Sequence, residues 1–189
     1  MIAHSSCSTY LSKALVFTWL LIIIFSGFSA NASKIQVQEY RIDSGDKIAI
    51  EVYGEPELSR ELLLNDSGKI NYPFLGEITI QGLTLYQVEQ AIHQGLKGDY
   101  LINPNVSVSI ITYRPFFIDG EVKKPGGYPY QPGLTVAKAA ALAGGFTERA
   151  SLDKIYIVKS GVDDKRPQPI DQHTLIGPGD IISIKQSFF

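Results

Sequence analysis

Residues 74–88 read FLGEITIQGLTLYQV and set out, in order, a short strand, a glycine turn and the start of a helix. Thr84 can cap the first helical turn while Gln87 reaches back toward it, which is the spacing of a capping box. From residue 85 to residue 96, apolar side chains recur at helical spacing on one face. Such a helix needs an apolar partner surface, so the segment predicts an α+β unit in which one helix packs on a sheet.

Parts of this pattern occur twice in the chain. The GLT triplet before the first helix returns as residues 133–135 before a second helical stretch, residues 136–143, and FLGE is echoed by residues 118–121, IDGE. Residues 44–48, SGDKI, are matched by residues 178–182, PGDII. In both, glycine turns the chain and the aspartate can bond to turn amides just before a strand. Two related modules are the favoured interpretation; chance similarity among turn residues is the alternative.

The remaining elements follow from alternating apolar residues and from turns rich in glycine and proline. We expect an α+β fold of two small modules of short mixed β-strands, each with one packed helix. The modules are expected at residues 33–112 and 113–189. Strands are expected at residues 47–53, 69–74, 76–80, 106–110, 116–121, 154–159 and 180–185.

The first 32 residues predict a signal peptide. Residues 14–30 carry no charge, follow Lys13, and lead to the small-residue pattern Ala-Asn-Ala at residues 30–32, where we expect cleavage. An uncleaved anchor is the alternative, because 17 apolar residues lie at the lower limit for spanning a bilayer. In either case the rest of the chain is expected to be exported.

Charge and cysteine content exclude several classes of function. The chain holds 17 Lys plus Arg against 19 Asp plus Glu, so no basic field is present and nucleic acid is not an expected partner. Its one cysteine, Cys7, lies before the expected cleavage point, so the exported part can form no disulfide. Export without disulfides points to a bacterial envelope. Cys7 also precedes the apolar run, so lipidation at the cleavage junction is not expected.

Catalytic and metal-binding patterns are weak. His93 and His173 have no partners at metal-ligand spacing, so neither a metal nor a cofactor is expected. Glu55 and Glu57 flank Pro56 and offer a carboxylate pair for an enzyme of carbohydrates, although turn carboxylates are usually only solvated. Tyrosines are the stronger functional signal, because their rings stack on sugar faces.

Taken together, these motifs resemble the bacterial polysaccharide biosynthesis/export proteins, which join a polysaccharide export domain to a soluble-ligand-binding β-grasp (SLBB) domain. The similarity to the export domain lies in residues 40–48, 52–58, 66–76 and 100–108. The similarity to the SLBB domain lies in residues 120–126, Tyr128, and residues 133–135, 143–145 and 178–180.

The resemblance implies a protein without enzymatic activity that helps a capsular or exopolysaccharide chain to leave the cell. It implies a ring of identical subunits in the periplasm, associated with the outer membrane, and an inner-membrane polysaccharide co-polymerase or kinase as partner. Longer members carry a lipidated cysteine and a C-terminal amphipathic helix that builds an outer-membrane pore. Neither pattern is found in this sequence, so we expect a ring or adaptor that uses a separate outer-membrane barrel.

Several polar and aromatic residues are candidates for contact with the polymer. In the first module they are Lys69, Asn71 and Tyr72, and in the second they are Lys123, Lys124, Tyr128 and Tyr130. Two alternatives stay open at this point. One is a monomeric periplasmic module that senses an oligosaccharide, and the other is a carbohydrate-active enzyme that uses the Glu55 and Glu57 pair.

Overall fold

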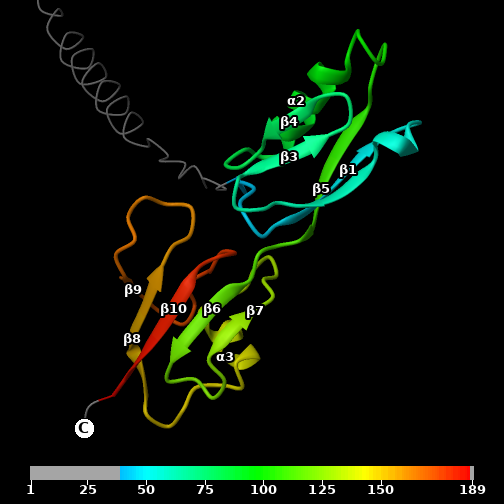
Figure 1. Cartoon of the computed structure of the whole chain (residues 1–189). Helices are drawn as coiled ribbons and strands as arrows, with labels where there is room; N and C mark the ends of the chain where they lie inside the picture. The colour runs from blue at the N-terminus through cyan, green and yellow to red at the C-terminus, as the bar shows by residue number, and fades with distance from the viewer. Residues whose placement is uncertain (1–38, 188–189) are drawn as a thin grey trace, which may run out of the picture. The chain divides into compact units, whose positions relative to one another are not determined.

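The computed structural model describes residues 39–187 (Figure 1). The expected signal peptide, residues 1–32, lies outside the described residues. Among residues 39–187, no helix is both long enough and apolar enough to cross a membrane.

The first module contains a three-stranded antiparallel sheet in the order β2-β1-β5. Its inward face carries Ile48, Ile50 and Val52, which alternate with exposed or half-exposed residues, the period expected of a half-buried strand. A separate hairpin of two strands supplies further core residues. The elements are β1 (Lys47–Val52), the 3-10 helix η1 (Pro56–Leu58), β2 (Arg60–Leu63), β3 (Lys69–Tyr72), β4 (Gly76–Thr79) and β5 (Val106–Thr112).

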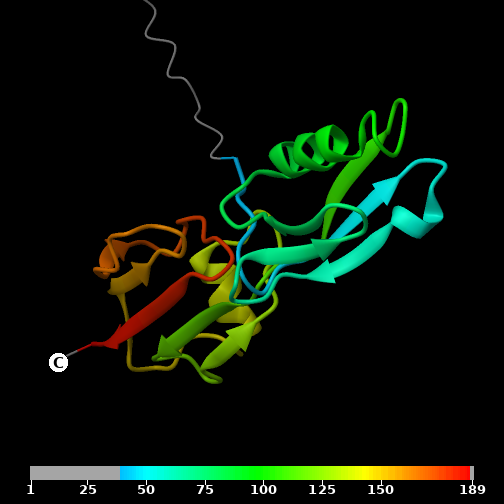
Figure 2. The same ribbon diagram turned by 45° about the horizontal axis from the view of Figure 1, so that its top comes forward.

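Helix α2 (Leu85–Leu96) packs beside β5, as Figure 2 shows. The predicted capping box is present, because the Thr84 hydroxyl accepts the Gln87 N–H while the Gln87 side chain accepts the Thr84 N–H. On the side facing the sheet, the Glu89 carboxylate accepts the backbone N–H of Val108 at 2.8 Å. Helix α2 therefore satisfies a backbone donor on the outer edge of β5.

The second module is a five-stranded sheet in the order β7-β6-β10-β8-β9, in which β10 and β6 are parallel and the other neighbours are antiparallel (Figure 1). Helix α3 (Val136–Leu142) buries Val136, Ala139 and Ala140 in this module's core. The small alanine side chains let the helix lie close to the sheet. The strands are β6 (Phe116–Gly120), β7 (Gly126–Tyr128), β8 (Ala150–Val158), β9 (Gln168–Ile170) and β10 (Ile181–Gln186).

The predicted fold class is confirmed: two mixed α+β modules, each with short strands in open sheets and one α-helix. Each module has its own cluster of buried apolar side chains. Sequence analysis missed three short strands. β2 lacks alternation, β7 reads as a Gly-Gly turn, and β9 contains a proline, so none of the three carries a strand signal.

The GLT triplets occupy matching places in the two modules. Ile42 donates its N–H to the carbonyl of Leu83 at 2.9 Å, and Ile176 donates to the carbonyl of Leu134 at 3.0 Å. The residue after each leucine, a threonine, caps the helix that follows. The echo of FLGE in IDGE does not extend to the structure, because the first lies in the β3–β4 hairpin and the second ends β6.

Candidate functional site

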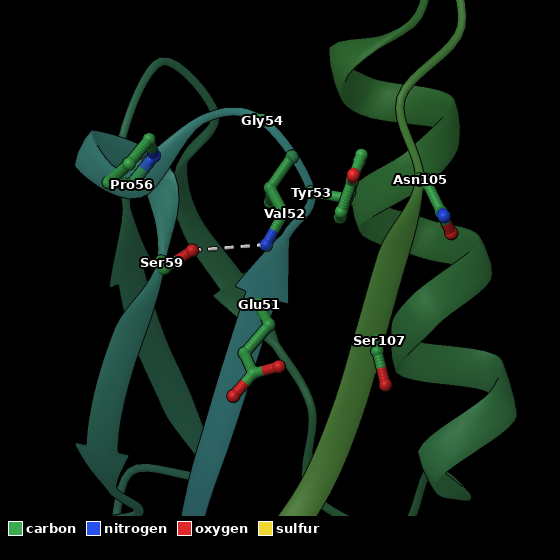
Figure 3. Close-up of a pocket in the computed structure, with 8 residues that line it drawn as sticks. All are labelled: Glu51, Val52, Tyr53, Gly54, Pro56, Ser59, Asn105 and Ser107. Carbon is green, nitrogen blue, oxygen red and sulfur yellow. Dashed lines mark hydrogen bonds between the residues drawn. The ribbon is translucent and has the colours of Figure 1, made fainter.

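An open groove lies at the end of β1 in the first module, with a volume of about 450 Å³. It is bounded by the end of β1, by the turn that leads into η1, and by the start of β5 (Figure 3). The lining residues are Glu51, Val52, Tyr53, Gly54, Pro56, Ser59, Asn105 and Ser107.

Strand alternation places the groove's side chains on one face. Glu51 is exposed on the outward side of β1, and Tyr53, the first residue after the strand, is exposed in the turn that follows. On the adjoining strand Ser107 is the register partner of Glu51. Asn105 binds the end of β1, because its carbonyl accepts the Tyr53 N–H at 2.9 Å. In Figure 3 these four side chains line the same surface.

The turn after β1 is held in place by its own hydrogen bonds. The Ser59 hydroxyl accepts the Val52 N–H at 3.1 Å, drawn as the dashed line in Figure 3, and Glu55 donates its N–H to the Val52 carbonyl at 3.0 Å. Pro56 begins η1 at a position where its missing N–H costs nothing. The turn that bounds the groove is therefore fixed by one backbone hydrogen bond and by the Ser59 hydroxyl.

Four polar side chains of the groove are free to bind a ligand, whereas the Ser59 hydroxyl is already bonded to the turn. Among the residues that the structure describes, the side chains of Glu51, Tyr53, Asn105 and Ser107 have no hydrogen-bond or ion-pair partner in the protein. The Tyr53 ring is 86% exposed. An aromatic face beside carboxylate, amide and hydroxyl groups can stack on a sugar and bond to its hydroxyls.

The candidates in the first module lie on β3, outside this groove. Lys69 and Asn71 are exposed on one side of the strand, and Lys69 pairs with Glu77 at 3.1 Å. Tyr72 points the other way: it is 1% exposed and its hydroxyl donates to the Leu58 carbonyl at 2.8 Å. Burial raises the pKa of Tyr72. Its ring therefore belongs to the core and offers no face to a polymer.

The candidates in the second module lie between β6 and the start of helix α3. Lys123 and Lys124 are exposed. The Tyr128 hydroxyl donates to the Lys124 carbonyl at 2.6 Å, so the structure brings these two residues together. Tyr130 is half-buried against Tyr113 in an edge-to-face contact, with ring centroids 5.4 Å apart. Burial is the main cause that raises the pKa of Tyr130.

The structure also bears on the alternative sites. No group of three or more His, Cys, Asp or Glu side chains arranged to hold a metal ion is found within residues 39–187. His93 bonds to the Pro104 carbonyl through Nδ1 at 2.8 Å, which fastens helix α2 to the start of β5. The Glu57 carboxylate lies in η1 and is exposed.

Comparison with known proteins assigns both modules. Residues 34–111 match the polysaccharide biosynthesis/export protein family, and residues 115–171 match the SLBB domain. The chain therefore combines a polysaccharide export domain with an SLBB domain. The match to an export family favours a transport role over the carbohydrate-active enzyme that the Glu55 and Glu57 pair suggested.

Curated relatives of the family agree with this assignment. The exopolysaccharide production protein ExoF of Rhizobium meliloti is 34% identical over 62% of this chain. The EPS I polysaccharide export outer membrane protein EpsA of Ralstonia nicotianae is 26% identical over 78% of it, as is the polysialic acid transport protein KpsD of Escherichia coli. The matches cover 31%, 47% and 24% of these proteins, so the chain spans half or less of each of them.

Sequence analysis did not select the residues of the groove. The alternation of β1 predicts that Glu51 and Tyr53 point outward, but alternation alone does not tell an exposed tyrosine from one covered by a neighbouring element. Asn105 and Ser107 reach the groove only through the pairing of β1 with β5, which joins residues more than 50 positions apart in the chain. That pairing carries no local signal.

Proposed function

We propose that this chain is an envelope polysaccharide export protein. It acts as a periplasmic ring or adaptor, associated with the outer membrane, that guides a capsular or exopolysaccharide chain across the periplasm and the outer membrane. We also propose that the export domain comprises residues 33–112 and the SLBB domain residues 113–189. The observation that carries the proposal is the presence of both domain matches, in this order, in one chain.

The proposed mechanism is passive. A hydrophilic polymer slides over hydrated polar surfaces and is bound weakly at many points, because tight binding at any one point would stop it. The exposed groups Lys69 and Asn71 of β3, and Lys123 and Lys124 after β6, suit such contacts. The half-buried rings of Tyr128 and Tyr130 add partial aromatic faces.

Three partners follow from the proposal. Copies of the chain itself form the ring, an inner-membrane polysaccharide co-polymerase or kinase delivers the polymer, and a separate outer-membrane barrel accepts it. The name of EpsA places that relative in the outer membrane. This is the reason for expecting the chain to work at that membrane.

Deletion of the gene tests the proposal. We expect the deletion strain to lose most of its surface or secreted polysaccharide, measured as total carbohydrate released by the cells, and a plasmid copy to restore it. Unchanged polysaccharide in the deletion strain would overturn the proposal. Native mass spectrometry of the protein extracted from the envelope should give an oligomer, whereas a monomer at high concentration would favour the sensing module.

Charge variants test the proposed polymer contacts. The double variant Lys123→Gln, Lys124→Gln keeps side-chain length and removes two exposed charges, so we expect normal protein levels with a several-fold loss of export. Lys165→Gln, in the exposed loop after β8, is the matched control and should export normally. Equal export by the two variants would remove Lys123 and Lys124 from the contact surface.

A further inference from the structure

We propose that the groove beside Tyr53 binds one or two units of a neutral, hydroxyl-rich polysaccharide. The inference rests on the proposed function and adds to it the chemical class of the polymer. It concerns the groove lined by Glu51, Tyr53, Asn105 and Ser107, which lies apart from the lysines discussed above.

Tyr53 supplies the stacking surface. Its backbone is fixed by the hydrogen bond to Asn105, while its ring is 86% exposed and makes no aromatic contact within the described residues. The exposed ring of Phe74, by comparison, stacks on Tyr100 with ring centroids 4.7 Å apart. An uncovered ring on a fixed backbone, beside polar groups, suits the apolar C–H face of a pyranose.

The polar groups around the ring match the edge of a sugar. The Glu51 carboxylate has only acceptor oxygens, which suit two neighbouring hydroxyl donors, and the Asn105 amide can both donate and accept. The Ser107 hydroxyl lies across the strand pair from Glu51. None of these three side chains has a protein partner among residues 39–187. By contrast, Lys47 and Glu61 on the same sheet pair with each other at 2.7 Å.

Charge determines which sugars fit. Glu51 is the one charged residue that lines the groove, and no lysine, arginine or histidine does. Arg60 stands opposite Ile50 in the register, so it belongs to the other face of the sheet. An acidic sugar would meet an unpaired carboxylate without a compensating cation, which costs binding energy. The groove therefore favours neutral units over uronic or sialic acids.

The size of the groove fits this role. A volume of about 450 Å³ lies at the lower end of the range for small-molecule sites. Binding through one ring and three polar groups should be weak, with a Kd of about 1 mM, so the polymer can leave as easily as it enters. Weak sites repeated in every subunit of a ring would act on the chain together.

Titration followed by amide NMR shifts tests the proposal. The exported protein is mixed with maltohexaose as the neutral probe and with hexagalacturonic acid as the acidic probe. We expect maltohexaose to shift the amides of Tyr53, Gly54 and Ser107, and hexagalacturonic acid to bind about 10-fold more weakly or not at all. Equal or tighter binding of the acidic probe, or neutral-probe shifts confined to other residues, would overturn the proposal.

Single variants separate the contribution of the Tyr53 aromatic ring from that of the Glu51 charge. Tyr53→Ala should abolish the maltohexaose shifts, whereas Tyr86→Ala, which removes another exposed tyrosine on helix α2, should leave them unchanged. Glu51→Gln should narrow the difference in affinity between maltohexaose and hexagalacturonic acid, because it removes the charge that repels the acidic probe. Shifts that persist in Tyr53→Ala, or a difference between the probes that Glu51→Gln does not change, would contradict the assignment.

An export assay distinguishes failure of this inference from failure of the proposed function. If the deletion strain loses its polysaccharide while Tyr53→Ala restores export in full and still binds maltohexaose, the chain is an exporter and the groove is not its site. If the deletion strain keeps its polysaccharide, the export function itself is wrong, whatever the groove binds.

Discussion

Asp46 and Asp180 make the same three kinds of hydrogen bond in the two modules. The Asp46 carboxylate accepts the backbone N–H of Asp43 at 2.9 Å. It also accepts the backbone N–H of Arg114, two residues after the end of β5, at 2.9 Å. It also accepts from the Arg114 guanidinium at 3.0 Å. One side chain therefore joins a turn, a strand end and a cation.

Asp180 repeats this arrangement. It accepts the backbone N–H of Gly177 at 2.7 Å and that of Ser160, which follows β8, at 2.9 Å. Its cation is Lys159, at 2.8 Å. Both aspartates are almost completely buried. The repeated Gly-Asp pair thus corresponds to a repeated structural unit, a turn carboxylate that fastens two neighbouring strands.

Replacing these carboxylates should weaken the fold to different degrees. Asp46→Asn removes the nearer of the two carboxylates that pair with the Arg114 side chain, which is only 12% exposed, and leaves Asp43 at 3.7 Å; it should destabilise by about 3 kcal/mol. Asp180→Asn should cost less, about 1–2 kcal/mol, because Lys159 is 36% exposed and can turn to water. Urea unfolding of the two variants measures the difference. Equal losses, or a larger loss in Asp180→Asn, would contradict this account.

The N-caps of helices α2 and α3 should contribute different amounts to the stability of the protein. Thr84 has a complete capping box and is buried, whereas Thr135 accepts a longer bond from the Lys138 N–H, at 3.4 Å. Thr84→Ala should therefore destabilise by about 1–2 kcal/mol and Thr135→Ala by about 0.5 kcal/mol. Thermal unfolding followed by circular dichroism tests the order. A larger effect at Thr135 would show that the hydrogen-bond geometry does not control the cap.

Gly120 and Gly133 form a matched pair of glycine positions. Both have positive φ, 82° and 79°, but a Cβ at Gly120 would overlap the carbonyl oxygen of Ile184, while a Cβ at Gly133 meets nothing within 4 Å. Gly133→Ala should cost about 1 kcal/mol from backbone strain alone. Gly120→Ala should cost about 3 kcal/mol or more, because β6 and β10 must move apart. Denaturant midpoints that coincide would refute the steric explanation.

Phe74 is the one residue other than glycine with positive φ among those the structure describes, at 64°. Glycine adopts this conformation without strain, so Phe74→Gly should be about 1 kcal/mol more stable than Phe74→Ala. Both variants lose the stacking on Tyr100, which cancels in the comparison. If the alanine variant proved the more stable in urea unfolding, the turn would not hold this conformation in solution.

Alkaline pH should destabilise the protein through Tyr40. Burial, followed by the hydrogen bond to the Asp46 carboxylate, raises the pKa of Tyr40 in the folded chain. Above a pH of about 10 the unfolded chain loses this proton while the folded chain keeps it, so the free energy of unfolding falls as pH rises. Tyr40→Phe removes the titrating group and should make that fall shallower between pH 9 and pH 11.

The alkaline measurement has an internal control. The pKa values of Tyr72 and Tyr130 are also raised, so part of the decline should remain in Tyr40→Phe. The urea midpoints of the unsubstituted protein and of Tyr40→Phe, measured at pH 8, 10 and 11, give the slope of stability against pH for each protein. Parallel slopes would mean that Tyr40 titrates in the folded chain as it does in the unfolded one.

Local patterns predicted much of the fold. The capping box at Thr84, the alternation in β1 and the two Gly-Asp turns each depend on residues close together in the chain, and each is found in the structure. The binding surface depends on longer-range relations. Tyr72 lies on a predicted strand, but only packing decides that its ring faces Leu58. Asn105 meets Tyr53 through strand pairing that no local pattern reveals.

The hydrogen bond from the Val108 N–H to Glu89 has a consequence for aggregation. An exposed strand edge is a template on which a strand of another molecule can grow. At β5 a strand from another molecule would have to displace helix α2 and break the charge-assisted hydrogen bond between Val108 and Glu89 before it could form its own hydrogen bonds. The helix thus shields this edge of the first sheet against the addition of a strand from another molecule, even at high protein concentration.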